Sequence, residues 1–369
     1  MSAHTCDVCT CVRCLRAQAT QVNISDGRAD VAGTFIWSGF DYLGESRGWP
    51  QIAKPRGTIA DAAGFTKESF YWLRQWWLSR IPPSDAGRPP LADTRTVFIV
   101  EAWKARRRAD GLPMTTHRTV HVYTDAPYLR IELNGAPVTA LLPTPAYGNA
   151  QALVEYAPGN LTAVALASDG RTILATHTRL TAATPTSLRL SLDAPAARTG
   201  TGTAVVADGE DVALVRVEVL DAAGRLCDTD TKTVVSFAVT SGEGVLWATA
   251  NGDPADTSRD SPYSHSRQVY YGLARAVVRS SSDHASPPAS RRMMISIDLE
   301  GGSRPDGSGV TVANPDVSPE ADPERPLAPI VIEATAAGLG AAQLAIPLSR
   351  DLADLPLAVA RRSAGAAWK

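Results

Sequence analysis

The chain has 369 residues, 44% of them hydrophobic, and a formal net charge of −2. This length is enough for about two to three domains of ordinary size, each with its own core. The near-neutral charge argues against a nucleic-acid partner and against a polybasic membrane anchor. The sequence has no run of about 18 apolar residues, and its first residues lack the apolar core of a secretory signal. We therefore expect a soluble globular protein, with the cytoplasm as one candidate location.

Four of the five cysteines, Cys6, Cys9, Cys11 and Cys14, lie close together near the N-terminus. A secreted disulfide scaffold would spread its cysteines along the chain. Four thiolates are a ligand set for zinc, so a zinc knuckle that regulates or targets the rest is one interpretation. The tight spacing leaves little backbone to surround the ion tetrahedrally. We favour the other interpretation, a disordered leader over residues 1–30 without a metal.

The next segment combines a strand pattern with a helix pattern. Residues 31–42 form an apolar, aromatic and β-branched run, which is typical of an interior parallel strand buried on both faces. Residues 64–80 predict a helix with Thr66 as N-cap and Arg80 in the last turn. One strand and one helix bury too little surface to fold alone, so the unit at 31–82 needs something to pack on.

The apolar periodicity changes to two after this segment. Short alternating runs follow at residues 96–104, 118–124, 128–134, 151–156, 161–168 and 171–179. Turn residues separate them, and Asp169-Gly170 between two such runs is a hairpin signal. Strands at this spacing predict an immunoglobulin-like β-sandwich over residues 93–182.

A second set of strands predicts another sandwich over residues 184–350. Its runs are at residues 186–192, 212–220, 233–240, 244–248, 268–279 and 330–336. The stretches 280–292 and 301–328 are rich in Ser, Pro, Gly and charged residues, which indicates surface insertions, and residues 351–369 form a tail. The predicted fold class is therefore mainly β.

Several blocks of this sequence, in order, resemble glycoside hydrolase family 2, most closely its bacterial β-galactosidase branch. The first blocks are AGTFIWSGFDYLGE, then GWP, then RGTIADAAGFTKESFYWLRQWW. They look like the last strand of the family's (β/α)8 barrel, the loop after it and the closing helix. Later blocks, including VHVYTDAPYLRIELNG and VALVRVEVLDAAGRLCDTDTKTVVSFAVT, look like the β-sandwich modules that follow the barrel there. The resemblance covers residues 31–350 apart from the two insertions.

The resemblance implies a retaining glycosidase that uses two glutamates about 5 Å apart, one acid/base and one nucleophile. In the family both lie on barrel strands earlier than the one that ends at Tyr42. The printed sequence has no glutamate before Glu45, so we assign no catalytic residue and expect no activity from this chain alone. A carbohydrate substrate and a partner chain that supplies the rest of the barrel are implied for the active assembly.

Two residues are candidates for contact with the sugar. Trp37 matches the family tryptophan that faces the sugar from the last strand; the alternative is a core tryptophan. Asp41 would lie at the carboxyl end of that strand, the functional face of such barrels. It could bind a sugar hydroxyl or a neighbouring strand, and we favour the structural role. The spacing of Asp41 and Glu45 does not support an acid/base pair.

Two further functions stay open. The sandwiches could act alone as a non-catalytic carbohydrate-binding or protein-interaction module, or residues 1–15 could form the zinc knuckle. The strand and helix at 31–80 favour the glycosidase, because a stand-alone module would expose this apolar segment.

Overall fold

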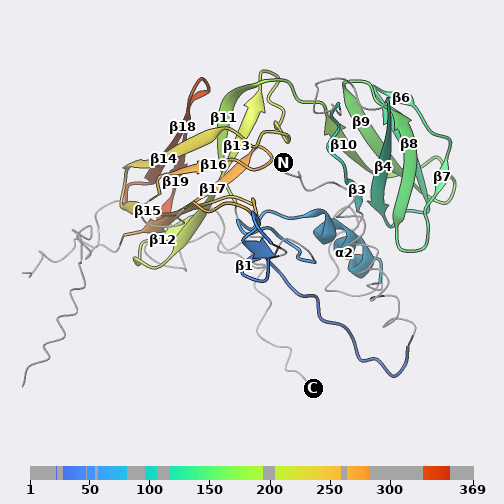
Figure 1. Ribbon diagram of the computed structural model, residues 1–369, viewed down its shortest axis with the longest axis horizontal. Coiled ribbons are helices and arrows are strands. Elements are labelled where there is room, and N and C mark those ends of the chain that lie inside the picture. The colour runs from blue at the N-terminus through green and yellow to red at the C-terminus, as the bar shows by residue number, and fades with distance from the viewer. Residues whose placement is uncertain are drawn as a thin grey trace, which may run out of the picture.

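The computed structural model describes residues 22, 28–46, 48–54, 57–80, 96–105, 116–193, 204–258, 264–281 and 327–349. The four N-terminal cysteines, most of both predicted insertions and the predicted tail lie outside this part. The described part is mainly β and contains two β-sandwiches, with a helix-bearing segment between and below them in Figure 1. No helix among these residues is long and apolar enough to cross a membrane.

The first sandwich consists of two antiparallel sheets. One contains β3 (Val97–Ile99), β4 (His117–Thr124) and β8 (Asn149–Glu155). The other contains β10 (Ile173–Leu180), β9 (Asn160–Leu166), β5 (Tyr128–Leu133), β6 (Ala136–Pro137) and β7 (Leu142–Pro143). Alternate residues of facing strands, such as Val120, Val122, Leu129 and Ile131, are fully buried and form one core. The alternating pattern in the sequence is this inward-facing set.

The second sandwich also has two antiparallel sheets. One contains β11 (Pro185–Leu192), β13 (Val212–Asp221), β17 (Leu273–Ser280) and β15 (Gly244–Ala250). The other contains β16 (Ser266–Gln268), β14 (Val234–Ser241), β18 (Ile330–Ala336) and β19 (Gly340–Ile346), and a short parallel pair joins β12 (Val205–Val206) to β20 (Leu348–Ser349). Val215, Val217, Phe237 and Ile332 are among the residues of its core.

Two turns that the sequence predicts, at Asp169-Gly170 and at Gly224, are present in the structure. Asp169 and Gly170 connect β9 to β10, and Gly170 has φ +66°, a conformation that glycine adopts without strain. The Asp169 carboxylate accepts hydrogen bonds from the side chain and backbone of Thr172 and from the Arg171 N–H, which lower its pKa to about 2. Gly224 closes the turn after β13 with φ +72°.

The interior strand predicted over residues 31–42 is not formed in the described residues. Residues 31–39 are irregular, Phe40 forms a single parallel bridge with Ala60, and only Tyr42–Leu43 (β1) is a strand, paired with Ala53–Lys54 (β2). An interior strand needs neighbours on both sides, whereas the backbone of residues 38–41 bonds in the described structure to Ile59 and Ala60 on one side. Its aromatic side chains are therefore exposed.

The predicted helix exists as α2 (Glu68–Leu78), shorter at both ends than the sequence indicated. Lys67 is the N-cap and makes no side-chain capping bond, so the N-cap prediction for Thr66 is wrong. Thr66 instead forms an antiparallel bridge with Ala60. Arg80 lies beyond the helix, and its guanidinium covers the Trp76 ring 3.1 Å from the ring centre.

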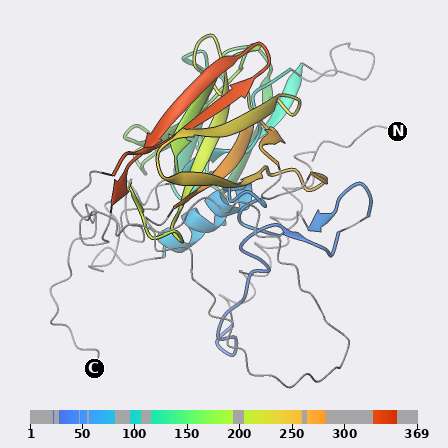
Figure 2. The same cartoon turned by 90° about the vertical axis from the view of Figure 1, so that its left-hand side faces the viewer.

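Helix α2 packs with its aromatic face on the outer side of the first sandwich. Figure 2 shows the helix below the β-sheets. Trp72, Leu73 and Trp76 are buried there. The Tyr71 ring stacks on Phe98 of β3, with ring centres 3.7 Å apart, and the Trp72 indole N–H donates to the Tyr147 carbonyl at 3.0 Å. The sandwich thus supplies the burial that the strand–helix unit lacks.

His177 makes the first sandwich sensitive to acid. Its Nδ1 accepts a hydrogen bond from the Ile99 N–H at 3.0 Å, which joins β10 to β3, and burial lowers its pKa to about 4 from the ordinary 6.5. Because the unfolded chain binds a proton at higher pH than the fold does, stability should fall between pH 6.5 and 4, by about 2 to 3 kcal/mol. Urea unfolding across this range measures the loss.

The control for this prediction is His177→Gln, which keeps an acceptor for the Ile99 N–H and removes the titration. The variant should show a flatter dependence on pH than the wild type. Equal slopes for both proteins would contradict the assignment to His177.

Candidate functional site

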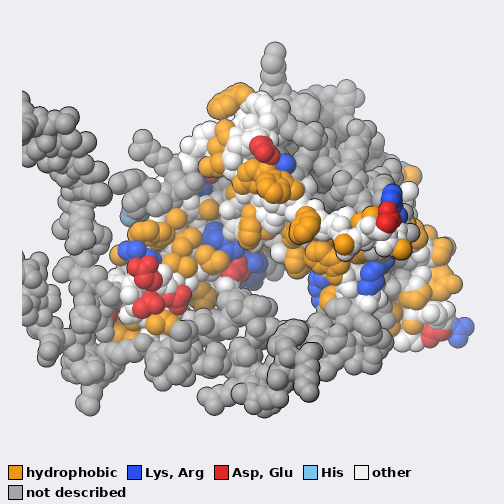
Figure 3. Space-filling model, turned by 90° about the horizontal axis from the view of Figure 1, so that it is seen from below, with side chains coloured by type: hydrophobic (Ala, Val, Ile, Leu, Met, Phe, Trp, Pro, Cys, Tyr) orange, Lys and Arg blue, Asp and Glu red, His pale blue; other side chains and the backbone are white. Residues whose placement is uncertain are grey.

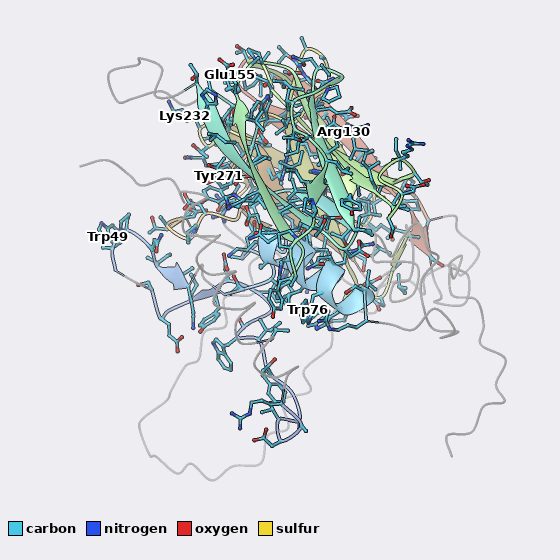
Figure 4. All side chains as sticks on the ribbon, turned by 90° about the vertical axis from the view of Figure 1, so that its right-hand side faces the viewer. Trp49, Trp76, Arg130, Glu155, Lys232 and Tyr271 are labelled. Carbon is cyan, nitrogen blue, oxygen red and sulfur yellow. The ribbon has the colours of Figure 1, made fainter. Side chains whose placement is uncertain are left out.

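The strongest candidate site is an exposed aromatic face on residues 35–49. Phe35, Trp37 and Trp49 are 102%, 69% and 82% exposed, and Phe40 and Leu43 are exposed beside them. Figure 3 shows hydrophobic side chains gathered on the underside of the molecule, and Figure 4 shows Trp49 at the end of this segment away from the sandwiches. The Trp37–Ser38 and Trp49–Pro50 peptide bonds are cis. Exposed aromatic side chains gathered over so short a stretch of chain are typical of a surface that a ligand or another protein segment covers.

A chain of hydrogen bonds fixes the Trp37 indole. Its Nε1–H donates to the Tyr42 hydroxyl at 2.6 Å, and that hydroxyl donates to Glu45 Oε2 at 2.6 Å. Lys54 Nζ donates to the same oxygen at 3.1 Å and lies over the Tyr42 ring. The hydrogen bonds from Tyr42 and Lys54 lower the pKa of Glu45, so its carboxylate is an anion that accepts both. The result is an oriented aromatic plane, a surface suited to the C–H face of a sugar.

Asp41 lies in a different environment from Trp37. Its side chain is 2% exposed, its Oδ1 accepts a hydrogen bond from the Thr58 hydroxyl, and Lys67 Nζ lies 2.8 Å from the same oxygen. Lys67 also donates to Thr58 Oγ1 at 2.8 Å. These contacts tie the end of the aromatic segment to the residues before α2. They fit the structural alternative for Asp41.

Asp61 lies at the contact between this segment and the second sandwich. Its Oδ1 accepts from the N–H groups of Ala63 and Phe65, each at 2.9 Å, and Oδ2 lies against Gly252 so closely that a Cβ there would overlap it. Burial raises the pKa of Asp61 to about 6, with a smaller contribution from the charge of Asp41. The carboxylate is therefore partly protonated near pH 6.

No metal centre forms within the described residues, which contain no group of three His, Cys, Asp or Glu side chains able to hold an ion. Cys6, Cys9, Cys11 and Cys14 lie outside them, so the zinc hypothesis stays a prediction. Cys227 is buried in the core of the second sandwich.

The second sandwich is the part of the chain that matches a known family model. Residues 199–286 match glycoside hydrolase family 2 C-terminal domain 5. A β-galactosidase of Bacteroides ovatus, BoGH2A, is 26% identical over 251 residues, which are 68% of this chain and 25% of that protein. The chain is thus similar to the C-terminal portion of glycoside hydrolase family 2 proteins. It spans about a quarter of the length of the curated relatives that it matches.

Two solved structures have a similar fold. A β-glycosidase from Bacteroides vulgatus matches with a TM-score of 0.61 and 19% identity, covering 89% of this chain and 32% of that one. A glycosyl hydrolase family 2 member from Bacteroides cellulosilyticus matches with a TM-score of 0.58 and 21% identity, covering 89% and 36%. At these identities the likeness concerns the fold.

The structure adds residues to the site that the sequence did not single out. Tyr42 and Glu45 are part of the family block, and their side chains turn out to hold Trp37. Asp61 and Lys67 also lie in a family block, but the sequence indicated no contact for them or for Lys54, because no periodicity reveals which loop residues pair.

The Lys67–Asp41 pair should be far more important for stability than the Lys54–Glu45 pair. Lys67→Met leaves the Asp41 carboxylate buried without its cation and should cost about 3 kcal/mol. Lys54→Met is the matched control, since Glu45 is 63% exposed, and it should cost less than about 1 kcal/mol. Thermal and urea unfolding compare the two variants. Equal losses would contradict the burial argument.

Asp61 should loosen the contact with the second sandwich as the pH rises. The folded protein holds the Asp61 proton up to about pH 6 and the unfolded chain releases it near 3.8, so stability is highest below 3.8 and falls until about 6. The wild type should lose about 2 kcal/mol relative to Asp61→Asn between pH 4 and 7.5. Hydrogen exchange of the amides of residues 57–67 in both proteins measures the difference. A constant difference across this range would contradict the assignment.

Proposed function

We propose that this chain is the C-terminal part of a retaining β-glycosidase of the β-galactosidase-like branch, which hydrolyses O-glycosidic bonds. Residues 31–82 are its last barrel strand and closing helix, and residues 93–182 and 184–350 are immunoglobulin-like sandwiches. The rest of the barrel, on the same polypeptide or on a partner chain, holds the two catalytic glutamates. Trp37 is the sugar-facing wall.

The observation that carries the proposal is the oriented indole of Trp37 in the middle of the family block. The ring is exposed, and its N–H is engaged by Tyr42, so the aromatic plane is held in place. An aromatic plane with polar groups at its edge is typical of carbohydrate sites. Asp41 has the role of a positioning residue in this proposal, because Lys67 and Thr58 occupy its Oδ1.

The exposed aromatic face argues for a barrel partner and against a stand-alone module. Strands of a parallel barrel are covered on both faces and hydrogen-bonded on both edges. The run at 31–42 has the composition of such a strand, while its side chains Phe35, Trp37 and Phe40 have no cover in the described structure. A second barrel strand beside it would bury them.

The purified chain should not turn over nitrophenyl β-galactoside or nitrophenyl β-glucuronide. The polypeptide extended by the codons that precede Met1 in frame should gain activity on one of them. In that extended protein Trp37→Ala should lower kcat/KM by at least about tenfold, since it removes the stacking surface.

Turnover by the chain alone that disappears in Asp41→Asn or Glu45→Gln would contradict the proposal. Full activity of the extended Trp37→Ala protein would reject the role of Trp37. Tyr128→Phe, a conservative change in a strand of the first sandwich, is the control and should leave kcat/KM unchanged.

A further inference from the structure

The hairpin that holds Trp37 is itself held by the second sandwich. Strand β2 pairs with β1 and carries Lys54, the last member of the chain that runs from Trp37 through Tyr42 and Glu45. The N–H groups of Ile52 and Ala53 both donate to the Pro254 carbonyl, at 2.9 and 3.1 Å. A single carbonyl of the second sandwich thus accepts two hydrogen bonds from the hairpin.

The loop that presents this carbonyl is rigidly built. Asn251 is buried, its Nδ2 donates to the Gln268 carbonyl at 2.8 Å, and its Oδ1 accepts from the Asp253 N–H at 3.0 Å. The side chain of Arg267, 1% exposed, forms an ion pair with Asp256 at 2.7 Å. Buried polar groups with satisfied partners fix a loop in one conformation. The loop 251–256 therefore offers the Pro254 carbonyl in a fixed position.

A second contact fixes the segment just before α2. Arg275 of β17 donates from Nε to the Ala63 carbonyl at 2.6 Å and from Nη2 to Asp193 at 2.5 Å. Its guanidinium lies 4.5 Å from the centre of the Phe65 ring, and that of Arg216 lies 5.3 Å from it. Phe65 is buried in this way on the outer face of the sheet of β11, β13, β17 and β15.

We propose that the second sandwich, the part that matches C-terminal domain 5, is a positioning module for the sugar-facing wall. Loop 251–256 holds hairpin β1–β2 through the Pro254 carbonyl, and Arg275 holds the segment behind it. The Tyr42–Glu45–Lys54 chain passes this constraint to the Trp37 indole. The inference rests on the proposed function for the meaning of Trp37, while the mechanical link stands on the contacts themselves.

The test follows the Trp37 indole N–H in the full 369-residue chain labelled with ¹⁵N-tryptophan, which gives one signal for each of the eight tryptophans. Trp37→Phe assigns the signal, and Tyr42→Phe marks its position when the indole loses its acceptor. Gly252→Ala, whose Cβ overlaps Asp61, and Arg275→Met each disturb the second sandwich at the contact. In both, the Trp37 signal should shift toward its position in Tyr42→Phe.

Arg189→Met is the matched control for Arg275→Met. Arg189 extends from β11 of the same sheet, pairs with Glu218 at 2.7 Å and is 54% exposed, so its loss should leave the Trp37 signal in place. The Trp103 indole donates to the Ala157 carbonyl within the first sandwich, so its signal reports that the first sandwich is intact. If Gly252→Ala or Arg275→Met does not fold, Arg275→Lys replaces it, since an ammonium cannot bond Ala63 and Asp193 in the same geometry.

A Trp37 signal at its wild-type position in folded variants with lowered thermal stability would overturn the proposal, because the sandwich would then be only a structural support. A shift in Arg189→Met as large as that in Arg275→Met would overturn it as well. The readout contains no sugar. Rejection of the sugar-facing role of Trp37 by the kinetic experiment would therefore leave this result standing.

Discussion

Residues 57–80 keep their shape by packing against two different β-sandwiches. The aromatic face of α2 lies on β3 and β4 of the first, where Trp72, Trp76 and Phe98 form a common core, and Phe65 lies under Arg216 and Arg275 of the second. One helix and a two-residue strand pair could not offset the chain entropy lost on folding without these contacts. The aromatic segment 31–54 depends on them in turn, since Asp41 is held by Lys67 immediately before the helix.

Two carboxylates that are close in sequence, Asp41 and Glu45, have different roles because their surroundings differ. Asp41 is buried and forms an ion pair with Lys67, and this pair connects the segment to the helix. Glu45 is exposed, accepts from Tyr42 and Lys54, and orients an indole. Neither arrangement resembles the paired acid and nucleophile of a retaining glycosidase, which face each other across a bond. Under the proposed function, the paired glutamates lie outside the described residues.

Much of the β-structure could be predicted from the sequence, because inward-facing residues alternate clearly in strands such as β4 and β13. Strand β19 could not, since its Gly and Ala residues carry no β signal and its pairing with β18 provides its structure. The run at 31–42 is the opposite case, because its sequence has a strong β signal and the described residues offer it little pairing. Its composition suits a strand with two neighbours, and the described structure supplies bonds to Ile59 and Ala60 on one side.

The candidate site was predictable in part. Trp37 follows from the family block, whereas the contacts with Pro254 and Gly252 join residues some 200 positions apart in sequence, which no local pattern reveals. The resemblance gives the family and the fold, and the physical contacts give the arrangement. Together they support our proposal that the second sandwich positions the sugar-facing wall.

The most direct measurement is a crystal structure of the polypeptide extended upstream of Met1, with a galactose-derived inhibitor bound. Our account predicts that the sugar ring lies against the Trp37 indole, with Asp41 still paired to Lys67 and Phe35 and Phe40 covered by a neighbouring barrel strand. A sugar bound away from Trp37, or an aromatic face that stays uncovered, would contradict it.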